Sequence, residues 1–121
     1  MRTLRRSLSA VVAGLALAVS GCSWVLIDGP PANHQALDHF ECDEGRGPAW
    51  VDVVVAGLGV VGAVTAEDDP AEEWWGIGAD TKRVGNIGIA VLSVASAATG
   101  FRRTSACTEA KRALIERTTG W

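Results

Sequence analysis

The chain has 121 residues and a formal net charge of −3, so it provides at most one small domain. The first 21 residues contain three arginines and no acid, and the rest contains eight basic and 14 acidic residues, a net charge of −6. This acidic balance offers little to neutralise phosphates, which excludes a nucleic-acid partner from the leading hypotheses and argues against attraction to anionic lipid.

The first 22 residues follow the three-part pattern of an export signal. A positive N-terminal segment precedes an apolar stretch, residues 8–19, that is too short for a membrane span. The stretch closes with an aliphatic residue, two small residues and a cysteine: Val19, Ser20, Gly21 and Cys22.

These four residues match the lipobox of bacterial lipoprotein signal peptides, so the chain resembles a lipoprotein precursor. The resemblance implies a signal peptide over residues 1–21, transfer of diacylglycerol to the Cys22 thiol, cleavage before Cys22 and, usually, acylation of the new N-terminus. Two or three acyl chains anchor a protein stably where one would be marginal. The expected location is the bacterial cell envelope, lipid-anchored and facing the periplasm or the exterior. An ordinary signal peptide or an uncleaved anchor helix is the alternative.

Lipidation would use one of the three cysteines and leave Cys42 and Cys107 in a compartment that permits disulfides. A bond between them would close a loop of about 65 residues and contribute about 4 kcal/mol in the chain-entropy model. Two free thiols, or bonds to a partner, are the alternatives.

Residues 22–47 are expected to hold the lipid anchor and a polar, extended segment, because a glycine and two prolines interrupt any regular element. Pro48 then opens an apolar segment, residues 49–66, that is broken only by Asp52. Proline in a first turn favours a helix, and Asp52 near that turn would complement the positive end of the helix dipole.

A second apolar segment, residues 84–101, follows a strongly polar connection over residues 67–83. Arg102 and Arg103 end the apolar segment. Residues 105–118 then have the pattern of a short, charged amphipathic helix, which predicts a separate C-terminal element.

The cysteines stand symmetrically about the two apolar segments. Cys42 lies about six residues before the first segment and Cys107 about six after the second, so two antiparallel helices would bring them together at one end. Both segments are rich in Gly, Ala and Ser, which permits close backbone approach at positions such as Gly59 and Ala63. We therefore predict an all-α fold over residues 48–121, a helical hairpin with a short C-terminal helix, closed by a disulfide.

Evidence for and against membrane insertion is divided. Each apolar segment has about 18 residues, near the minimum for a bilayer, although much of each is Gly and Ala. The acidic connection would face the cytoplasm and Arg102 and Arg103 the outside, which opposes the positive-inside tendency. The tryptophans suit interfacial positions: Trp24, Trp50, Trp74, Trp75 and Trp121. We favour an inserted hairpin over one packed in the periplasm or in an oligomer.

Residues 57–62 read G-x-G-x-x-G, the fingerprint of a dinucleotide-binding turn. Pro70 and a run of acids cut the required helix short, and the chain is too small for a doubly wound sheet. Helix packing is the preferred interpretation of these glycines, and we predict no cofactor.

Several polar residues before the first apolar segment are candidate metal ligands: His34, Asp38, His39, Glu41 and Cys42. They lack the helical histidine pair of zinc proteases, so a solvated surface is the preferred interpretation and we predict no metal. No serine lies in a nucleophile elbow, and the acidic residues 67–73 lack the pattern of a calcium loop. We predict no catalytic residue.

Beyond the lipobox, the chain resembles a group of small bacterial lipoproteins that contain a two-helix hairpin and have no known activity. The resemblance rests on three short stretches: Gly29-Pro30-Pro31, Cys42 with Pro48 and Asp52, and Gly100 through Cys107 to Lys111. The leading hypothesis is a lipid-anchored, non-enzymatic envelope component, structural or accessory, that packs against a membrane-protein partner or its own copies. The alternative is a periplasmic module that binds a ligand or metal through residues 32–47 or the acidic connection.

Overall fold

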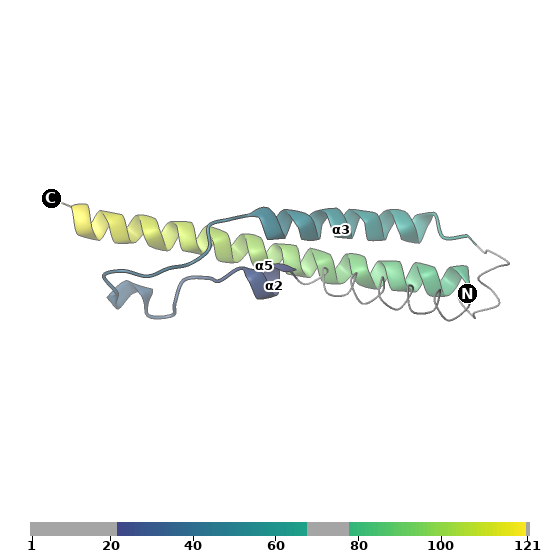
Figure 1. Ribbon diagram of the computed structural model, residues 1–121, viewed down its shortest axis with the longest axis horizontal. Coiled ribbons are helices and arrows are strands. Elements are labelled where there is room, and N and C mark those ends of the chain that lie inside the picture. Colours follow the sequence, from purple (N-terminus) through teal and green to yellow (C-terminus); the bar gives the residue numbers. More distant parts are fainter. Residues whose placement is uncertain (1–21, 68–77, 121) are drawn as a thin grey trace, which may run out of the picture.

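The protein is a long helical hairpin with a short third helix against it (Figure 1). The computed structural model describes residues 22–67 and 78–120. In chain order, these contain α2 (Cys22–Leu26), a 3-10 turn (His34–Ala36), α3 (Gly47–Val64) and α5 (Ala79–Thr119), and no strand. The two long helices pack against each other, which confirms the predicted all-α hairpin.

Some of the predicted features lie outside the described residues. These are the signal peptide over residues 1–21, most of the acidic connection, and the tryptophans Trp74, Trp75 and Trp121.

Helix α3 occupies the first apolar segment almost as predicted, beginning one residue before Pro48. The proline takes a first-turn position, where its missing N–H is not needed. Both the backbone N–H and the hydroxyl of Thr65 donate to the carbonyl of Val61, which satisfies one of the last carbonyls of the helix. The Arg83 side chain donates to the Ala63 carbonyl from α5 and provides a second C-terminal cap.

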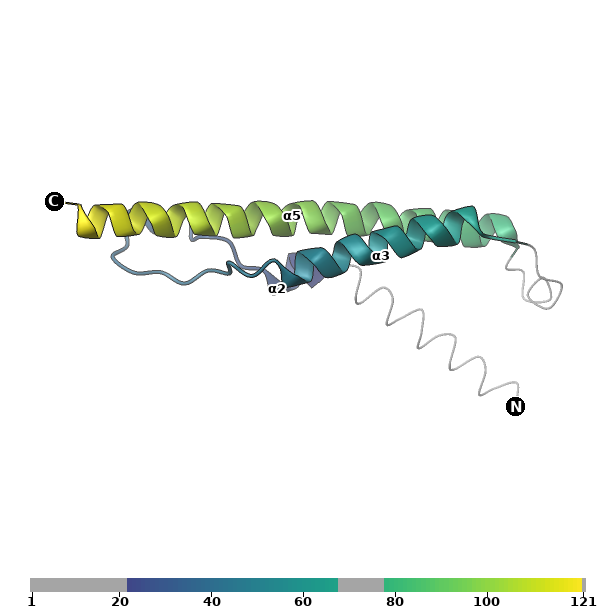
Figure 2. The same cartoon turned by 90° about the horizontal axis from the view of Figure 1, so that it is seen from above.

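Helix α5 joins two elements that the sequence pattern separates. The second apolar segment and residues 105–118 are both helical, as expected, but they form one helix of 41 residues, about 60 Å long. Arg102 and Arg103 do not interrupt it, because arginine is a good helix former and no proline occurs between residues 79 and 119. The charged half of α5 therefore extends well beyond the N-terminal end of α3 (Figure 2).

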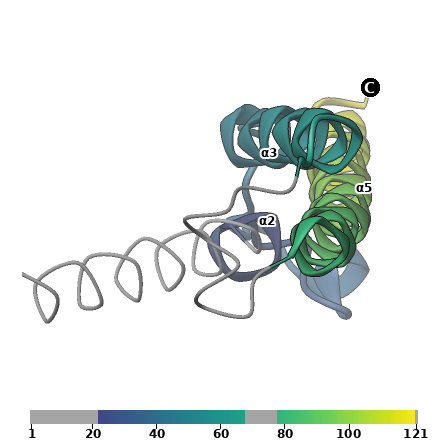
Figure 3. The same ribbon diagram turned by 90° about the vertical axis from the view of Figure 1, so that its right-hand side faces the viewer.

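Helix α2 lies beside the N-terminal end of α3 and the middle of α5 (Figure 2). Seen end-on, it lies next to both long helices (Figure 3). It approaches α5 at Gly100, where an added Cβ would lie 2.7 Å from the Ser23 Cβ and 3.0 Å from the Ile27 Cδ1. The Arg103 guanidinium donates to the carbonyls of Trp24 and Ile27, at 3.0 and 2.8 Å, and so caps the C-terminal end of α2.

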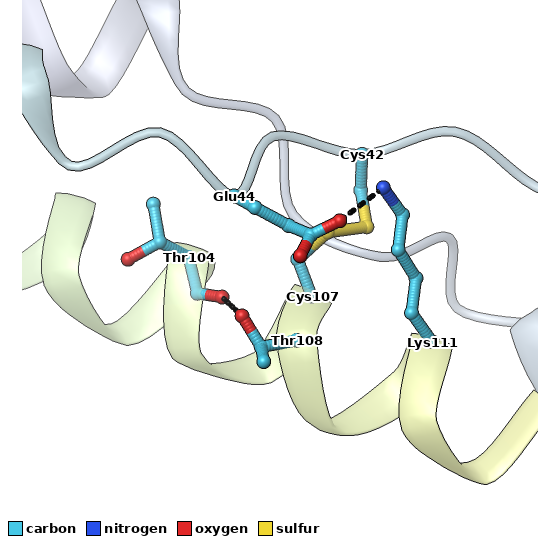
Figure 4. Close-up of polar contacts among 6 residues, drawn as sticks. All are labelled: Cys42, Glu44, Thr104, Cys107, Thr108 and Lys111. Carbon is cyan, nitrogen blue, oxygen red and sulfur yellow. Dashed lines mark hydrogen bonds and ion pairs between the residues drawn. A yellow bond between two sulfur atoms is a disulfide. The ribbon is translucent and has the colours of Figure 1, made fainter.

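The segment between α2 and α3 runs along the charged half of α5 and back (Figure 1). Cys42 and Cys107 form a disulfide with a Cα–Cα distance of 5.9 Å, as the fold prediction required. Beside it, the Lys111 ammonium pairs with the Glu44 carboxylate (Figure 4). These contacts attach an irregular chain to a rigid helix.

Candidate functional site

Three features of the molecule lie on the open-end side of the hairpin: the predicted lipidation residue, a buried carboxylate and, three turns of α5 beyond the carboxylate's partner Ser96, the disulfide. Cys22 is the first residue of α2, and α2 packs where α3 begins. Cys107 lies two turns beyond Gly100, the residue of α5 against which α2 packs. The lipid anchor would therefore sit at the boundary between the paired helices and the disulfide-bonded part.

Small residues fill the interface between α3 and α5. The buried positions recur at intervals of three and four residues, which places them on one face of each helix. On α3 they are Ala49, Asp52, Ala56, Gly59 and Ala63. The buried residues of α5 are Ala90, Ser93, Ser96, Ala97, Gly100, Thr104, Cys107 and Ala110. Of these, Gly100 lies against α2 and Cys107 is bonded to Cys42.

The close approach of the helices depends on specific glycines. A Cβ at Gly59 would lie 2.9 Å from the Asn86 carbonyl oxygen, and one at Gly62 would lie 2.8 Å from the Asn86 side-chain nitrogen. A Cβ at Gly57 would meet nothing within 4 Å. The G-x-G-x-x-G stretch therefore lies inside a helix, where two of its three glycines serve helix packing.

Large apolar side chains point away from the interface. On α3 the exposed ones are Trp50, Val51, Val53, Val54, Leu58, Val60, Val61 and Val64. On α5 they are Val84, Ile87, Val91, Leu92, Val94 and Ile115. A water-soluble helix pair would bury these side chains and expose the small ones, so the distribution is the reverse of that in an aqueous core.

Asp52 lies within the small-residue interface, with none of its surface exposed. Its Oδ2 accepts a hydrogen bond from the Ser96 hydroxyl at 2.7 Å and another from the Ser23 backbone N–H at 3.2 Å. Its Oδ1 has no hydrogen-bond partner among the described residues, and neither do the buried hydroxyls of Ser23 and Ser93. One carboxylate thus connects α2, α3 and α5.

This position of Asp52 differs from the sequence prediction, which placed it near the first turn to complement the helix dipole. It is the sixth residue of α3, and the first turn contains no acid. The sequence could have predicted that Asp52 is buried, because it is four residues before Ala56 and seven before Gly59. A charged residue that continues a small-residue stripe shares its buried face.

The metal-ligand candidates are spread out rather than brought together. His34 Nδ1 donates to the Pro31 carbonyl at 2.8 Å, and the ring packs edge-on against Phe40. Asp38, His39 and Glu41 are exposed. Within residues 22–67 and 78–120, no group of three or more His, Cys, Asp or Glu side chains is placed to hold a metal ion.

No family model, curated protein or solved structure matches this chain. Both α3 and α5 are long and apolar enough to cross a membrane, and in each apolar window only 28% of the residues are buried. The core helix of a water-soluble protein is mostly buried, so this low value favours membrane association.

Proposed function

We propose that this protein is a lipid-anchored component of the bacterial cell envelope whose hairpin inserts into the membrane. Its role is structural or accessory and non-enzymatic. Acyl chains on Cys22 hold the chain at the outer surface, α3 and the first half of α5 cross the lipid, and the charged half of α5 projects from the surface.

The observation that carries this proposal is the reversed distribution of side chains in the hairpin. Helices in a bilayer gain nothing by burying Val and Leu against each other, because lipid is equally apolar, and they associate through small residues instead. Here the buried face of α3 carries Ala and Gly with one acid, Asp52, that of α5 carries mainly Ala, Gly and Ser, and the outward faces carry Val, Leu and Ile. The acyl chains of a bilayer would cover these outward apolar faces.

The dimensions of the hairpin agree with insertion. Helix α3 has 18 residues, about 27 Å, close to the hydrocarbon thickness of about 30 Å. Trp50 and Phe101 pack edge-on at the open end, with ring centroids 5.6 Å apart, where an interfacial aromatic pair would lie. Lys82 and Arg83 mark the opposite end of the span.

The acidic connection would face the cytoplasm, against the usual excess of Lys and Arg on that side. In this proposal, export of Cys22 and formation of the disulfide retain both ends of the hairpin on the oxidising side. Orientation then follows from these two covalent constraints instead of from loop charge.

Intact mass is the first test of the anchor. Protein extracted from membranes should have the mass of residues 22–121 plus acyl chains, and two thiols should become alkylatable only after reduction. A mass that retains residues 1–21, or lacks acyl chains, would contradict the lipoprotein assignment.

Insertion is tested by labelling two matched cysteine variants with a membrane-impermeant maleimide. Thr119→Cys lies at the end of α5 and Thr65→Cys next to the connection, and both threonines are exposed. In intact spheroplasts, Thr119→Cys should be labelled at once and Thr65→Cys only after permeabilisation. Equal labelling of both before permeabilisation would place the hairpin on the membrane surface or in the periplasm.

A further inference from the structure

The Asp52 carboxylate is buried where a positive group could pair with it, and no described side chain provides that group. It is fully buried, and its Oδ2 is satisfied by two neutral donors while Oδ1 has no partner among the described residues. A buried carboxylate is costly unless a positive group is paired with it.

The two arginines that bond to helix ends are used elsewhere. The Arg103 guanidinium donates to the carbonyls at the end of α2. Arg83 caps α3 at the opposite end of the hairpin. Neither forms an ion pair with Asp52, whose contacts come from the first turn of α2 and from Ser96 on α5.

The chain acquires a positive group at this place if it is cleaved before Cys22, a step that rests on the proposed function. Hydrolysis of the Gly21–Cys22 peptide bond consumes one water and leaves a carboxylate on Gly21 and an α-ammonium on Cys22. Consecutive nitrogens along a helix are about 3 Å apart. The Ser23 nitrogen is 3.2 Å from the Asp52 Oδ2, so the new ammonium begins within about 6 Å of it, inside pairing range.

We propose that the buried carboxylate of Asp52 binds the α-ammonium group that signal-peptide cleavage creates on Cys22. The pair links the lipid-anchored end of the chain to the interior of the hairpin. It exists only in the mature protein, because the precursor has a neutral peptide nitrogen at the same position. It also requires that the α-amine stay free, so both acyl chains are on the thiol-linked glycerol and none is on nitrogen.

The pairing is tested by the reactivity of the α-amine in detergent-extracted mature protein. An amine-acetylating reagent is applied at pH 7, and acetylation of the N-terminal peptide is followed by mass spectrometry. The variant Asp52→Asn should react about tenfold faster than the wild type, because an amine loses reactivity when a carboxylate holds it protonated. Asp38→Asn, which removes an exposed carboxylate, is the matched control and should react like the wild type. Equal rates in all three proteins would overturn the pairing.

A second measurement separates pairing from a general structural role of Asp52. Cys22→Ser blocks lipidation and so keeps the precursor uncleaved. Asp52→Asn should lower the melting temperature of the mature protein by about 5 °C or more, and should leave that of the uncleaved precursor unchanged or raise it. Equal destabilisation, or loss of folding in both forms, would overturn the proposal.

The intact mass of the extracted protein distinguishes failure of the ion-pair proposal from failure of the proposed function. An uncleaved or unlipidated chain contradicts the lipoprotein assignment itself. A chain that is cleaved at Cys22 but carries a third acyl group on nitrogen leaves the anchor standing and overturns only the ion pair.

Discussion

The clearest perturbation of the hairpin is a single methyl group at Gly59, for which Gly57 on the same helix is a natural control. An added Cβ at Gly59 would lie 2.9 Å from the Asn86 carbonyl oxygen and 3.1 Å from the Ala90 Cβ. The oxygen belongs to the backbone of α5 and cannot rotate away, so α3 and α5 must separate. At Gly57 the same methyl group would meet nothing within 4 Å.

The magnitude follows from two opposing terms. Replacing glycine by alanine inside a helix favours the helix by about 1 kcal/mol at either position. Overpacking at Gly59 costs about 1–3 kcal/mol, and at Gly57 nothing. The free energies of unfolding of Gly59→Ala and Gly57→Ala should therefore differ by about 1–3 kcal/mol, or by roughly 5–15 °C in melting temperature for a domain of this size.

The assay is thermal unfolding of both variants in the same detergent, followed by far-ultraviolet circular dichroism with the disulfide intact. Gly57→Ala should melt at or above the wild-type temperature and Gly59→Ala below it. Equal melting temperatures would refute the packing of α3 on α5 through this face. Leucine at the same two positions should widen the difference.

Three further predictions concern the open end of the hairpin. Reducing the disulfide should lower the free energy of unfolding by about 4 kcal/mol, measured as a shift in melting temperature with and without reductant, and an unchanged melt would show that the bond constrains little. Gly100→Leu should displace α2 and expose the segment before α3 to limited proteolysis, whereas Gly88→Leu, with nothing within 4 Å, should leave cleavage unchanged. Arg103→Ala removes two hydrogen bonds to the end of α2 and should lower the free energy of unfolding by about 1 kcal/mol relative to Arg102→Ala. Arg102 is the control because its side chain is exposed, and equal stability of the two variants would refute the capping role.

Local signals in the sequence predict most of the fold. Pro48, the two apolar segments and the symmetric placement of Cys42 and Cys107 are enough for a disulfide-closed hairpin, and the structure confirms it. The single long α5 was not predicted, because a change from apolar to charged residues at Arg102 resembles the end of a helix. The polarity of a segment indicates whether it faces an apolar or an aqueous environment. The helix itself ends where a proline, a cap or a turn residue stops it.

The arrangement of side chains around the hairpin depends on tertiary structure. The sequence by itself determines that Gly59 and Ala63 lie on one helical face, since a period of 3.6 residues is local geometry. It does not determine whether that face or the valine-rich one meets α5, because either choice satisfies the same backbone hydrogen bonds. Packing decides it: small residues bring the backbones together and leave the large apolar side chains outside.

Asp52 shows the same division most clearly. The sequence analysis placed Asp52 near the first turn of the helix, where an acid would complement the helix dipole. Its contacts with Ser96, 44 residues away, and Ser23, 29 residues away, exist only after three helices have assembled. Burial of a carboxylate depends on which distant donors converge on it, and that convergence is a property of the folded chain.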